Sequence, residues 1–450
     1  MLAIFLFFSV LPIAEGQGTP PVSIYGGSDA VVGLYIEDLS DGNVIVKSNS
    51  EKSMIPASIM KALTSATALS IFDPEGTFRT PVTTTGAIRN GVIEGDIVIS
   101  TIGDPTVESR HFPSKLGFAD SVVKHLKGLH VTEIKGSVVI DEKGFKDEST
   151  PQGWLDEDIT ALYGAGLYAS NFRDNHVVLK LPSKETVPVT PALKINVNPS
   201  KERLKVSRKR DTKVYEITGR IPSKGFASKY TNPAPGSAMR AEVLDRIRSA
   251  GIKISDDASG IKKGTRDLYV HHSPRVMDVL RSLMFRSDNM MAEGMLRSTL
   301  PGRTRDDAAR RELEMWRGRG LDTDGVTVKD GSGLSRMDRM TPKFMAELLK
   351  WMACSDMRDE YTSLFPRAGM EGTMRRFLKG TPLEGRIAMK TGSMRGVQCF
   401  AGYKLDDNDK PTHVVVIMVN NFSVGRDKLR REISDMLLST FDIDWVAFGQ

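Results

Sequence analysis

Residues 56–69 read PASIMKALTSATAL, an apolar run that holds a serine and a lysine three positions apart. A proline at its start and a DPEG stretch after it predict a helix from about Ala57 to Phe72. Side chains at positions i and i+3 share one face of a helix, so Ser58 and Lys61 are expected to lie side by side.

The Ser-x-x-Lys spacing alone is a weak signal, because the chain contains it at Ser58/Lys61, Ser121/Lys124 and Ser259/Lys262. Ser58 differs in lying at the first turn of an apolar helix, where free backbone N–H groups point toward a developing oxyanion. A serine hydroxyl needs a base within hydrogen-bonding reach to act as a nucleophile. Lys61 can serve only as a neutral amine, which burial and neighbouring cations favour. The site should therefore hold a second cation and a proton-relaying hydroxyl.

Two further motifs supply these groups. Ser287-Asp288-Asn289 is the only Ser-x-Asn in the chain, and Lys390-Thr391-Gly392 is the only Lys-Thr-Gly. The first lies between helical segments and the second at the end of an alternating strand. Taken singly, Asn289 is explained by a helix cap and Gly392 by a strand turn. The three motifs together, in this order, are the signature of class A β-lactamases and penicillin-binding proteins.

The pattern around these motifs predicts an α+β fold. Residues 30–50 form two strands joined at Asp41-Gly42, a strong hairpin signal. After residue 266 the chain is expected to become helical, and it closes with three strands and a last helix. This order of elements predicts an antiparallel sheet flanked by helices, and the N-terminal hairpin is expected to complete the sheet. We expect one domain from two segments, 17–78 and 266–450.

Residues 79–265 are expected to form one large strand-rich insertion of two subdomains, with a helix over 236–252. Its basic run SKERLKVSRKRDTK (200–213) has two interpretations, a solvated hairpin face or a site for a polyanion. We favour the solvated face.

The first residues, MLAIFLFFSVLPIA, are too short an apolar run to span a bilayer but fit the core of a secretory signal peptide over residues 1–16. A buried N-terminal strand is the alternative. We expect an exported protein of the periplasm or cell envelope, with no later transmembrane segment. Cys354 and Cys399 could pair in that compartment, but no pattern in the sequence shows it.

The composition of the chain excludes few classes of function. Hydrophobic residues make up 40% and charged residues 26% of the chain, as in soluble globular proteins, and the net charge of +6 only mildly favours acidic surroundings. The sequence lacks a zinc-ligand spacing and a Walker-type phosphate loop, so no metal or cofactor is expected.

The chain resembles the class C low-molecular-mass penicillin-binding proteins, the D-alanyl-D-alanine carboxypeptidase/endopeptidase family of the bacterial envelope. The resemblance covers nearly the whole chain after residue 16 and includes the three motifs, DGSGLSR (330–336), IGDPT (102–106) and GWLDEDITALYGA (153–165). It implies a penicillin-binding/β-lactamase-like serine transpeptidase domain with a large insertion between the first two motifs. β-Lactamases keep these motifs much closer together.

The resemblance also implies a role for each motif residue. Ser58 would attack the carbonyl of the penultimate D-alanine and Lys61 would take its proton. Ser287 would pass a proton to the leaving amine, and Asn289 would hold the amide of the acyl side. Lys390 would keep Lys61 neutral and attract the terminal carboxylate.

The remaining predicted contacts concern substrate binding. Thr391 would bind the carboxylate, Gly392 lies in the same motif, and the N–H groups of Ser58 and Ser393 would form the oxyanion hole. By similarity, Asp158 would meet the free amine of a diaminopimelate-type residue, with Tyr163 and Arg336 close by; a solvated carboxylate is the alternative for Asp158.

Two positions depart from the family's pattern. Arg395 replaces the polar uncharged residue that many relatives carry just past the third motif, and residues 164–175 differ from the usual block. Either change could shift the preference between free pentapeptide ends and cross-linked ones.

The sequence thus predicts a peptidoglycan hydrolase that acts on stem peptides, is acylated by β-lactam antibiotics, and associates with the wall or the membrane surface. A β-lactamase is the nearest alternative, although no glutamate can be placed as its deacylation base. A catalytically idle wall-binding module is the alternative from another class, and a nucleic-acid-binding protein is a distant third.

Overall fold

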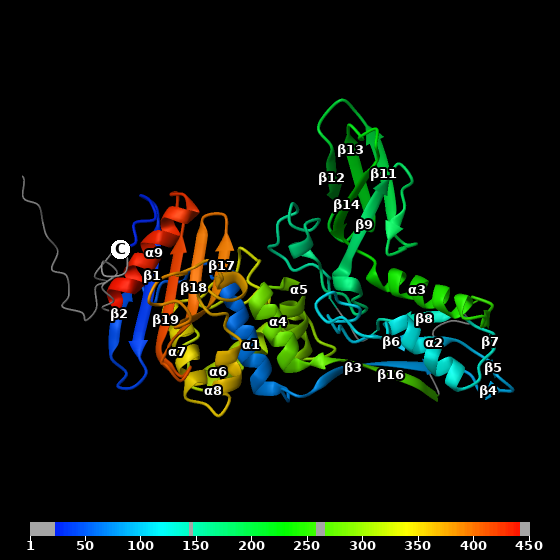
Figure 1. Ribbon diagram of the computed structural model, residues 1–450, viewed down its shortest axis with the longest axis horizontal. Coiled ribbons are helices and arrows are strands. Elements are labelled where there is room, and N and C mark those ends of the chain that lie inside the picture. Colours follow the sequence, from blue (N-terminus) through cyan, green and yellow to red (C-terminus); the bar gives the residue numbers. More distant parts are fainter. Residues whose placement is uncertain (1–22, 144–146, 258–265, 442–450) are drawn as a thin grey trace, which may run out of the picture.

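The core of the protein is a five-stranded antiparallel sheet with the order β17-β18-β19-β1-β2 (Figure 1). The computed structural model describes residues 23–143, 147–257 and 266–441, so the predicted signal peptide and the pair Ser259/Lys262 lie outside the described residues. The strands are β1 (Val31–Asp38), β2 (Val44–Ser48), β17 (Ile387–Met394), β18 (Val397–Leu405) and β19 (Pro411–Asn420). The predicted hairpin is confirmed, and β1 pairs with β19, which joins the two ends of the chain in one sheet.

Strand β19 is apolar from Val414 to Val419 because both of its faces are covered there. Val414 and Val416 pack into the core beneath one set of helices, whereas Val415 and Ile417 pack into the core beneath α9 (Arg426–Thr440). Successive side chains of a strand point to opposite faces. A continuous apolar run therefore marks a strand buried between two layers.

The helices on the first face carry the first two predicted motifs, and the third lies on β17. The helix predicted from Ala57 is confirmed, with a first turn of 3-10 type, η1 (Ala57–Ile59), followed by α1 (Met60–Ile71). In Figure 1, α1 lies between the sheet and α4 and α5. The other helices on this side are α4 (Val276–Arg286), α5 (Asn289–Ser298), α6 (Arg305–Gly318), α7 (Pro342–Ala353) and α8 (Arg358–Ser363).

The chain enters and leaves the insertion through two paired strands, β3 (Thr77–Thr84) and β16 (Arg266–Arg275). One apolar cluster packs β6 (Ile97–Ser100) with α2 (Phe118–Gly128) and α3 (Pro235–Ser249). A second, smaller cluster packs β9 (His176–Leu181) against β13 (Val214–Gly219). The two clusters agree with two subdomains, and the exact domain boundaries stay a prediction.

The smaller strands of the insertion complete its sheets. They are β4 (Ile88–Arg89), β5 (Val92–Ile93), β7 (Glu133–Ile134), β8 (Val138–Asp141), β10 (Thr186–Val187), β11 (Lys194–Pro199), β12 (Lys205–Arg208), β14 (Phe226–Thr231) and β15 (Lys253–Ile254). The sheet of β9, β10 and β14 and the sheet of β11, β12 and β13 project away from the body of the molecule (Figure 1).

Two expectations from the sequence need correction. Residues 266–275 form strand β16 rather than helix, because they pair with β3, a partner nearly the whole insertion away in sequence. The basic run does lie on a β12–β13 hairpin, but it is not wholly solvated. Arg208 is buried and donates to the carbonyl of Ile159, and Arg210 donates to the carbonyls of Pro151 and Trp154.

Within the described ranges, no helix is long and apolar enough to cross a bilayer. Cys354 is exposed, Cys399 is buried, and both are free thiols.

Candidate active site

The turn that carries Ser58 is pressed against the edge strand β17. Ala57 adopts a left-handed backbone conformation (φ +47°) just before Ser58. A Cβ atom at Gly392 would lie 2.7 Å from the carbonyl oxygen of Pro56 and 3.0 Å from the backbone nitrogen of Ser58. The third motif therefore has a glycine where the strand backbone meets the nucleophile turn.

Lys61 is fully buried, and its amine contacts three oxygen atoms. The Nζ atom lies 3.0 Å from Ser58 Oγ, 2.7 Å from Asn289 Oδ1 and 2.6 Å from the carbonyl oxygen of Ser332. The structure thus brings the predicted nucleophile, the predicted base and the second motif together.

The second motif is a sharp turn between two helices. Ser287 ends α4 in a left-handed conformation (φ 59°, ψ 41°), and Asp288 caps α5 by accepting from the N–H of Met291 at 2.9 Å. Because the chain reverses in this way, Ser287 Oγ and the amide of Asn289 both reach the site. The Asn289 amide donates to the carbonyl oxygen of Tyr163 at 2.9 Å.

Lys390 brings the second predicted amine into the site. It is fully buried, and its Nζ lies 2.9 Å from Ser287 Oγ and 2.7 Å from the carbonyl of Thr391. The Thr391 hydroxyl donates to Thr373 Oγ1 at 2.9 Å. The exposed Ser393 side chain donates to the buried amide of Gln398 at 3.1 Å.

Burial of the two amines dominates the electrostatics of the site. It lowers the pKa of Lys61 from 10.5 to about 8, even though nearby acidic groups raise this pKa. Those groups are Asp330, Asp288, Glu293 and Asp338. Burial also holds the pKa of Lys390 well below its usual range, and the charge of Lys61 lowers it further. A neutral amine next to Ser58 is therefore accessible near neutral pH.

Comparison with known proteins identifies the family. The model of the D-Ala-D-Ala carboxypeptidase 3 (S13) family matches residues 27–440. The chain belongs to this family. Its members are serine-type carboxypeptidases, so the protein is a hydrolase of that class, and the penicillin-binding fold predicted from the motifs is confirmed.

Individual relatives of this S13 chain are distant. It is 24% identical to the D-alanyl-D-alanine carboxypeptidase DacB of Haemophilus influenzae over 88% of this chain and 86% of the relative. It is 25% identical to the D-alanyl-D-alanine carboxypeptidase of an Actinomadura species, over 83% and 75% of the two chains. The crystal structure of penicillin binding protein 4 from H. influenzae superposes with a TM-score of 0.78 at 22% identity, covering 91% of this chain and 96% of that one.

Two of the predicted substrate-binding side chains are in direct contact. The Tyr163 hydroxyl, on a side chain that is 55% exposed, donates to Asp158 at 2.6 Å. Arg336 donates to the carbonyl oxygen of Arg395, at 3.0 Å from Nη2. The arginine that departs from the family's pattern thus meets Arg336 through its backbone.

Sequence reasoning missed several residues that surround the predicted motif residues. The DGSGLSR block gave no sign that the carbonyl of Ser332 would contact Lys61, nor that Asp330 would be the buried centre of that loop. Trp154 donates to Asp330 at 2.5 Å, and its only signal was membership of a block resembling the family. No pattern in the sequence pointed to Thr373, which accepts from the Thr391 hydroxyl.

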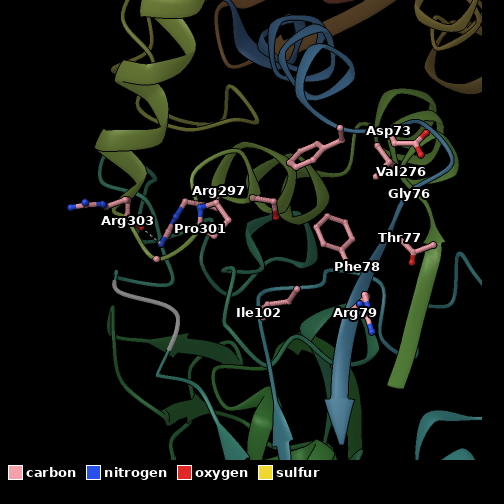
Figure 2. Close-up of a pocket in the computed structure, with 13 residues that line it drawn as sticks. Asp73, Gly76, Thr77, Phe78, Arg79, Ile102, Val276, Arg297, Pro301 and Arg303 are labelled. Carbon is pink, nitrogen blue, oxygen red and sulfur yellow. Dashed lines mark hydrogen bonds between the residues drawn. The ribbon is translucent and has the colours of Figure 1, made fainter. Parts of the chain in front are cut away.

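Two further features lie outside this constellation. No group of three His, Cys, Asp or Glu side chains that could hold a metal occurs in the described part of the chain. An apolar pocket of about 630 Å³ lies at the far end of α1, between Phe72, Phe78, Ile102 and Val276 (Figure 2). None of the three motifs lines this pocket.

Proposed function

We propose that this protein is a serine D-alanyl-D-alanine carboxypeptidase, with endopeptidase activity on D-alanyl cross-links, that works through an acyl-enzyme on Ser58. The observation that carries the proposal is the contact of Ser58 Oγ with the buried amine of Lys61, whose pKa is lowered to about 8. A hydroxyl beside a neutral amine is an activated nucleophile.

In the acylation step, Ser58 Oγ attacks the carbonyl carbon of the penultimate D-alanine, and Lys61 Nζ takes the hydroxyl proton. The N–H groups of Ser58 and Ser393 stabilise the negative charge that develops on the carbonyl oxygen. The C–N bond then breaks: Ser287 gives its hydroxyl proton to the leaving amine, and the Lys61 ammonium returns a proton to Ser287 and becomes neutral again. The contact of Ser287 Oγ with Lys390 Nζ at 2.9 Å supports a hydroxyl held in position for this transfer.

Substrate binding and turnover use the remaining motif residues. Lys390 and Thr391 hold the terminal carboxylate, and Asn289 holds the amide of the acyl side. Water then attacks the ester carbonyl, which releases the shortened stem peptide and restores Ser58. When the leaving amine belongs to a second stem peptide, the same steps cleave a D-alanyl cross-link.

Names of relatives support these assignments. Two are D-alanyl-D-alanine carboxypeptidases, and the Haemophilus protein has also been solved with a bound β-lactam. A peptidoglycan endopeptidase of Bdellovibrio bacteriovorus shares the fold, with a TM-score of 0.54 at 14% identity.

Incubation with a purified pentapeptide separates this proposal from its alternatives. The proposal predicts release of free D-alanine and a slowly hydrolysed penicillin adduct. Rapid turnover of penicillin would instead favour the β-lactamase. Folded protein that neither releases D-alanine nor is labelled by penicillin would leave only the wall-binding module.

The rate of acylation by penicillin should rise with pH and level off above about pH 8. Lys61 acts as the base only when neutral, and below its pKa of about 8 the neutral fraction grows about tenfold per pH unit. Stopped-flow labelling with a fluorescent penicillin from pH 6 to pH 9 measures this profile. A flat profile would show that Lys61 is not the base.

Gly392→Ala should slow acylation by at least about tenfold, because a misplacement of about 1 Å near the reacting atoms has effects of this size. The added methyl would lie 3.0 Å from the Ser58 nitrogen and would push β17 away from the nucleophile turn. Gly425→Ala is the matched control, since a Cβ there meets no atom within 4 Å. Equal acylation rates for both variants would contradict the close approach.

Asp158→Asn should lower kcat/KM about tenfold for a stem peptide with a free diaminopimelate amine, because a charge-assisted contact is lost. The same substitution should leave the kcat/KM for an N-acetylated substrate nearly unchanged. Loss of activity on both substrates would assign Asp158 a structural role through Tyr163 instead.

We further propose export to the periplasm or cell envelope, with association at the wall or membrane surface. Peptidoglycan as substrate supports this location. N-terminal sequencing of the protein recovered from the envelope fraction tests it, since an intact Met1 would rule out cleavage near residue 16.

A further inference from the structure

The hydrogen bonds around Lys61 fix the direction of its lone pair. A neutral amine has two N–H bonds and one lone pair. Asn289 Oδ1 at 2.7 Å and the Ser332 carbonyl at 2.6 Å can only accept, so they take the two N–H bonds. The lone pair is left facing Ser58 Oγ at 3.0 Å, which can donate. Any change that moves either acceptor therefore misdirects the base.

The Ser332 carbonyl is held in place by the carboxylate of Asp330. One oxygen of Asp330 accepts from the N–H groups of Ser332 and Gly333, and the other accepts from the N–H of Ser335 and from Trp154 Nε1. A Cβ atom at Gly333 would lie 2.0 Å from the carbonyl oxygen of Ala57, so this loop packs directly on the nucleophile turn.

The amide of Asn289 is held by a second contact of the same kind. Its nitrogen donates to the carbonyl oxygen of Tyr163 at 2.9 Å, which turns Oδ1 toward Lys61. A flipped amide would present N–H to Lys61 and lose both bonds.

Trp154 and Tyr163 belong to one segment of the insertion, residues 151–164, and this segment is itself anchored. Arg210 donates to the carbonyl of Trp154 at 2.6 Å and to that of Pro151 at 3.0 Å. Arg208 donates to the carbonyl of Ile159 at 3.1 Å. The basic hairpin of the insertion therefore holds this segment through its backbone carbonyls.

We propose that residues 151–164 are a positioning element for the base: Trp154, through Asp330 and Ser332, and the Tyr163 carbonyl, through Asn289, aim the Lys61 lone pair at Ser58. This inference rests on the proposed acylation of Ser58. It gives the insertion a part in acylation itself, beyond contact with the substrate's side chain.

Trp154→Phe tests the proposal because it removes the indole N–H and keeps an aromatic ring. The acylation rate at high pH should fall about tenfold, the size expected for a lost hydrogen bond to a charged group. The rising limb of the pH profile should also move to lower pH, because a displaced Ser332 carbonyl no longer stabilises the Lys61 ammonium. The charged groups that face Lys61, namely Asp288, Glu293, Asp330, Asp338 and Lys390, are unchanged in this variant.

Trp316→Phe is the matched control. Trp316 is buried like Trp154, and its indole donates to Thr67 at 2.9 Å, away from the three motifs. The Trp316→Phe variant should lose thermal stability but keep the wild-type acylation rate. The rising limb of its pH profile should stay at the wild-type pH. Trp154→Phe behaving like Trp316→Phe would overturn the proposal.

A second pair of variants tests the proposal if Trp154→Phe does not fold. Arg210→Met removes the hydrogen bonds to the carbonyls of Pro151 and Trp154 and should slow acylation, as Trp154→Phe should. Lys209→Met, at the exposed neighbouring position, should leave the acylation rate unchanged. Equal acylation rates for this pair would also count against the proposal. If the wild-type protein is not labelled on Ser58 at all, the proposed function fails and this inference falls with it; labelled wild type with unaffected variants overturns the inference alone.

Discussion

Ser58→Ala should lower the rate of D-alanine release from a pentapeptide by a factor on the order of 10⁴ or more, the size seen when a catalytic nucleophile is removed. Ser58 Oγ is the hydroxyl that Lys61 Nζ contacts, at 3.0 Å. Without it, the base has no nucleophile to deprotonate. Chromatography of free D-alanine over time measures the effect.

Ser121→Ala is the control for this substitution, because Ser121 belongs to a Ser-x-x-Lys pair on α2 of the insertion. It should keep wild-type activity. Ser58→Ala protein with an unchanged melting temperature and more than about one hundredth of wild-type activity would contradict the assignment of the nucleophile.

Lys61→Arg should slow acylation by penicillin by about 10³-fold, within the range that general-base catalysis contributes. A guanidinium stays charged at any pH the protein tolerates, so it cannot accept the proton of Ser58. The amine of Lys61, by contrast, has its pKa lowered to about 8 by burial. Stopped-flow labelling at pH 9 compares the two proteins where the wild-type amine is mostly neutral.

The larger guanidinium also has to fit a fully buried position, so packing must be separated from chemistry. Lys61→Met, which is uncharged and similar in length, should show the same loss, and Lys124→Arg on α2 should show none. Acylation by the arginine variant within about tenfold of wild type would mean that another group is the base.

The motif residues were predictable because their chemistry fixes residue type and spacing. A serine at a helix start needs a nearby amine, and a neutral amine needs burial and a second cation. Five residues meet those requirements in the sequence, and each is hydrogen-bonded to another of the five in the structure: Ser58, Lys61, Ser287, Asn289 and Lys390. The predicted hairpin and the closing strands likewise followed from turn residues and apolar alternation.

The parts of the site that act through the backbone could not be predicted in the same way. The carbonyl of Ser332 and that of Tyr163 are set by loop conformation, and a carbonyl is present at every residue. Arg208 and Arg210 were predicted to be solvated because the carbonyls of Ile159 and Trp154, to which they donate, lie more than 40 residues earlier in the chain. Strand β16 was missed for a related reason, since its partner β3 is distant in sequence.

The proposed function depends above all on the formation of an acyl-enzyme on Ser58. Mass spectrometry of the protein after brief exposure to benzylpenicillin, followed by proteolysis and peptide sequencing, tests it most directly. We expect one penicilloyl adduct, carried by the serine of the PASIMK segment. An adduct on any other residue, or folded protein that carries none, would contradict it.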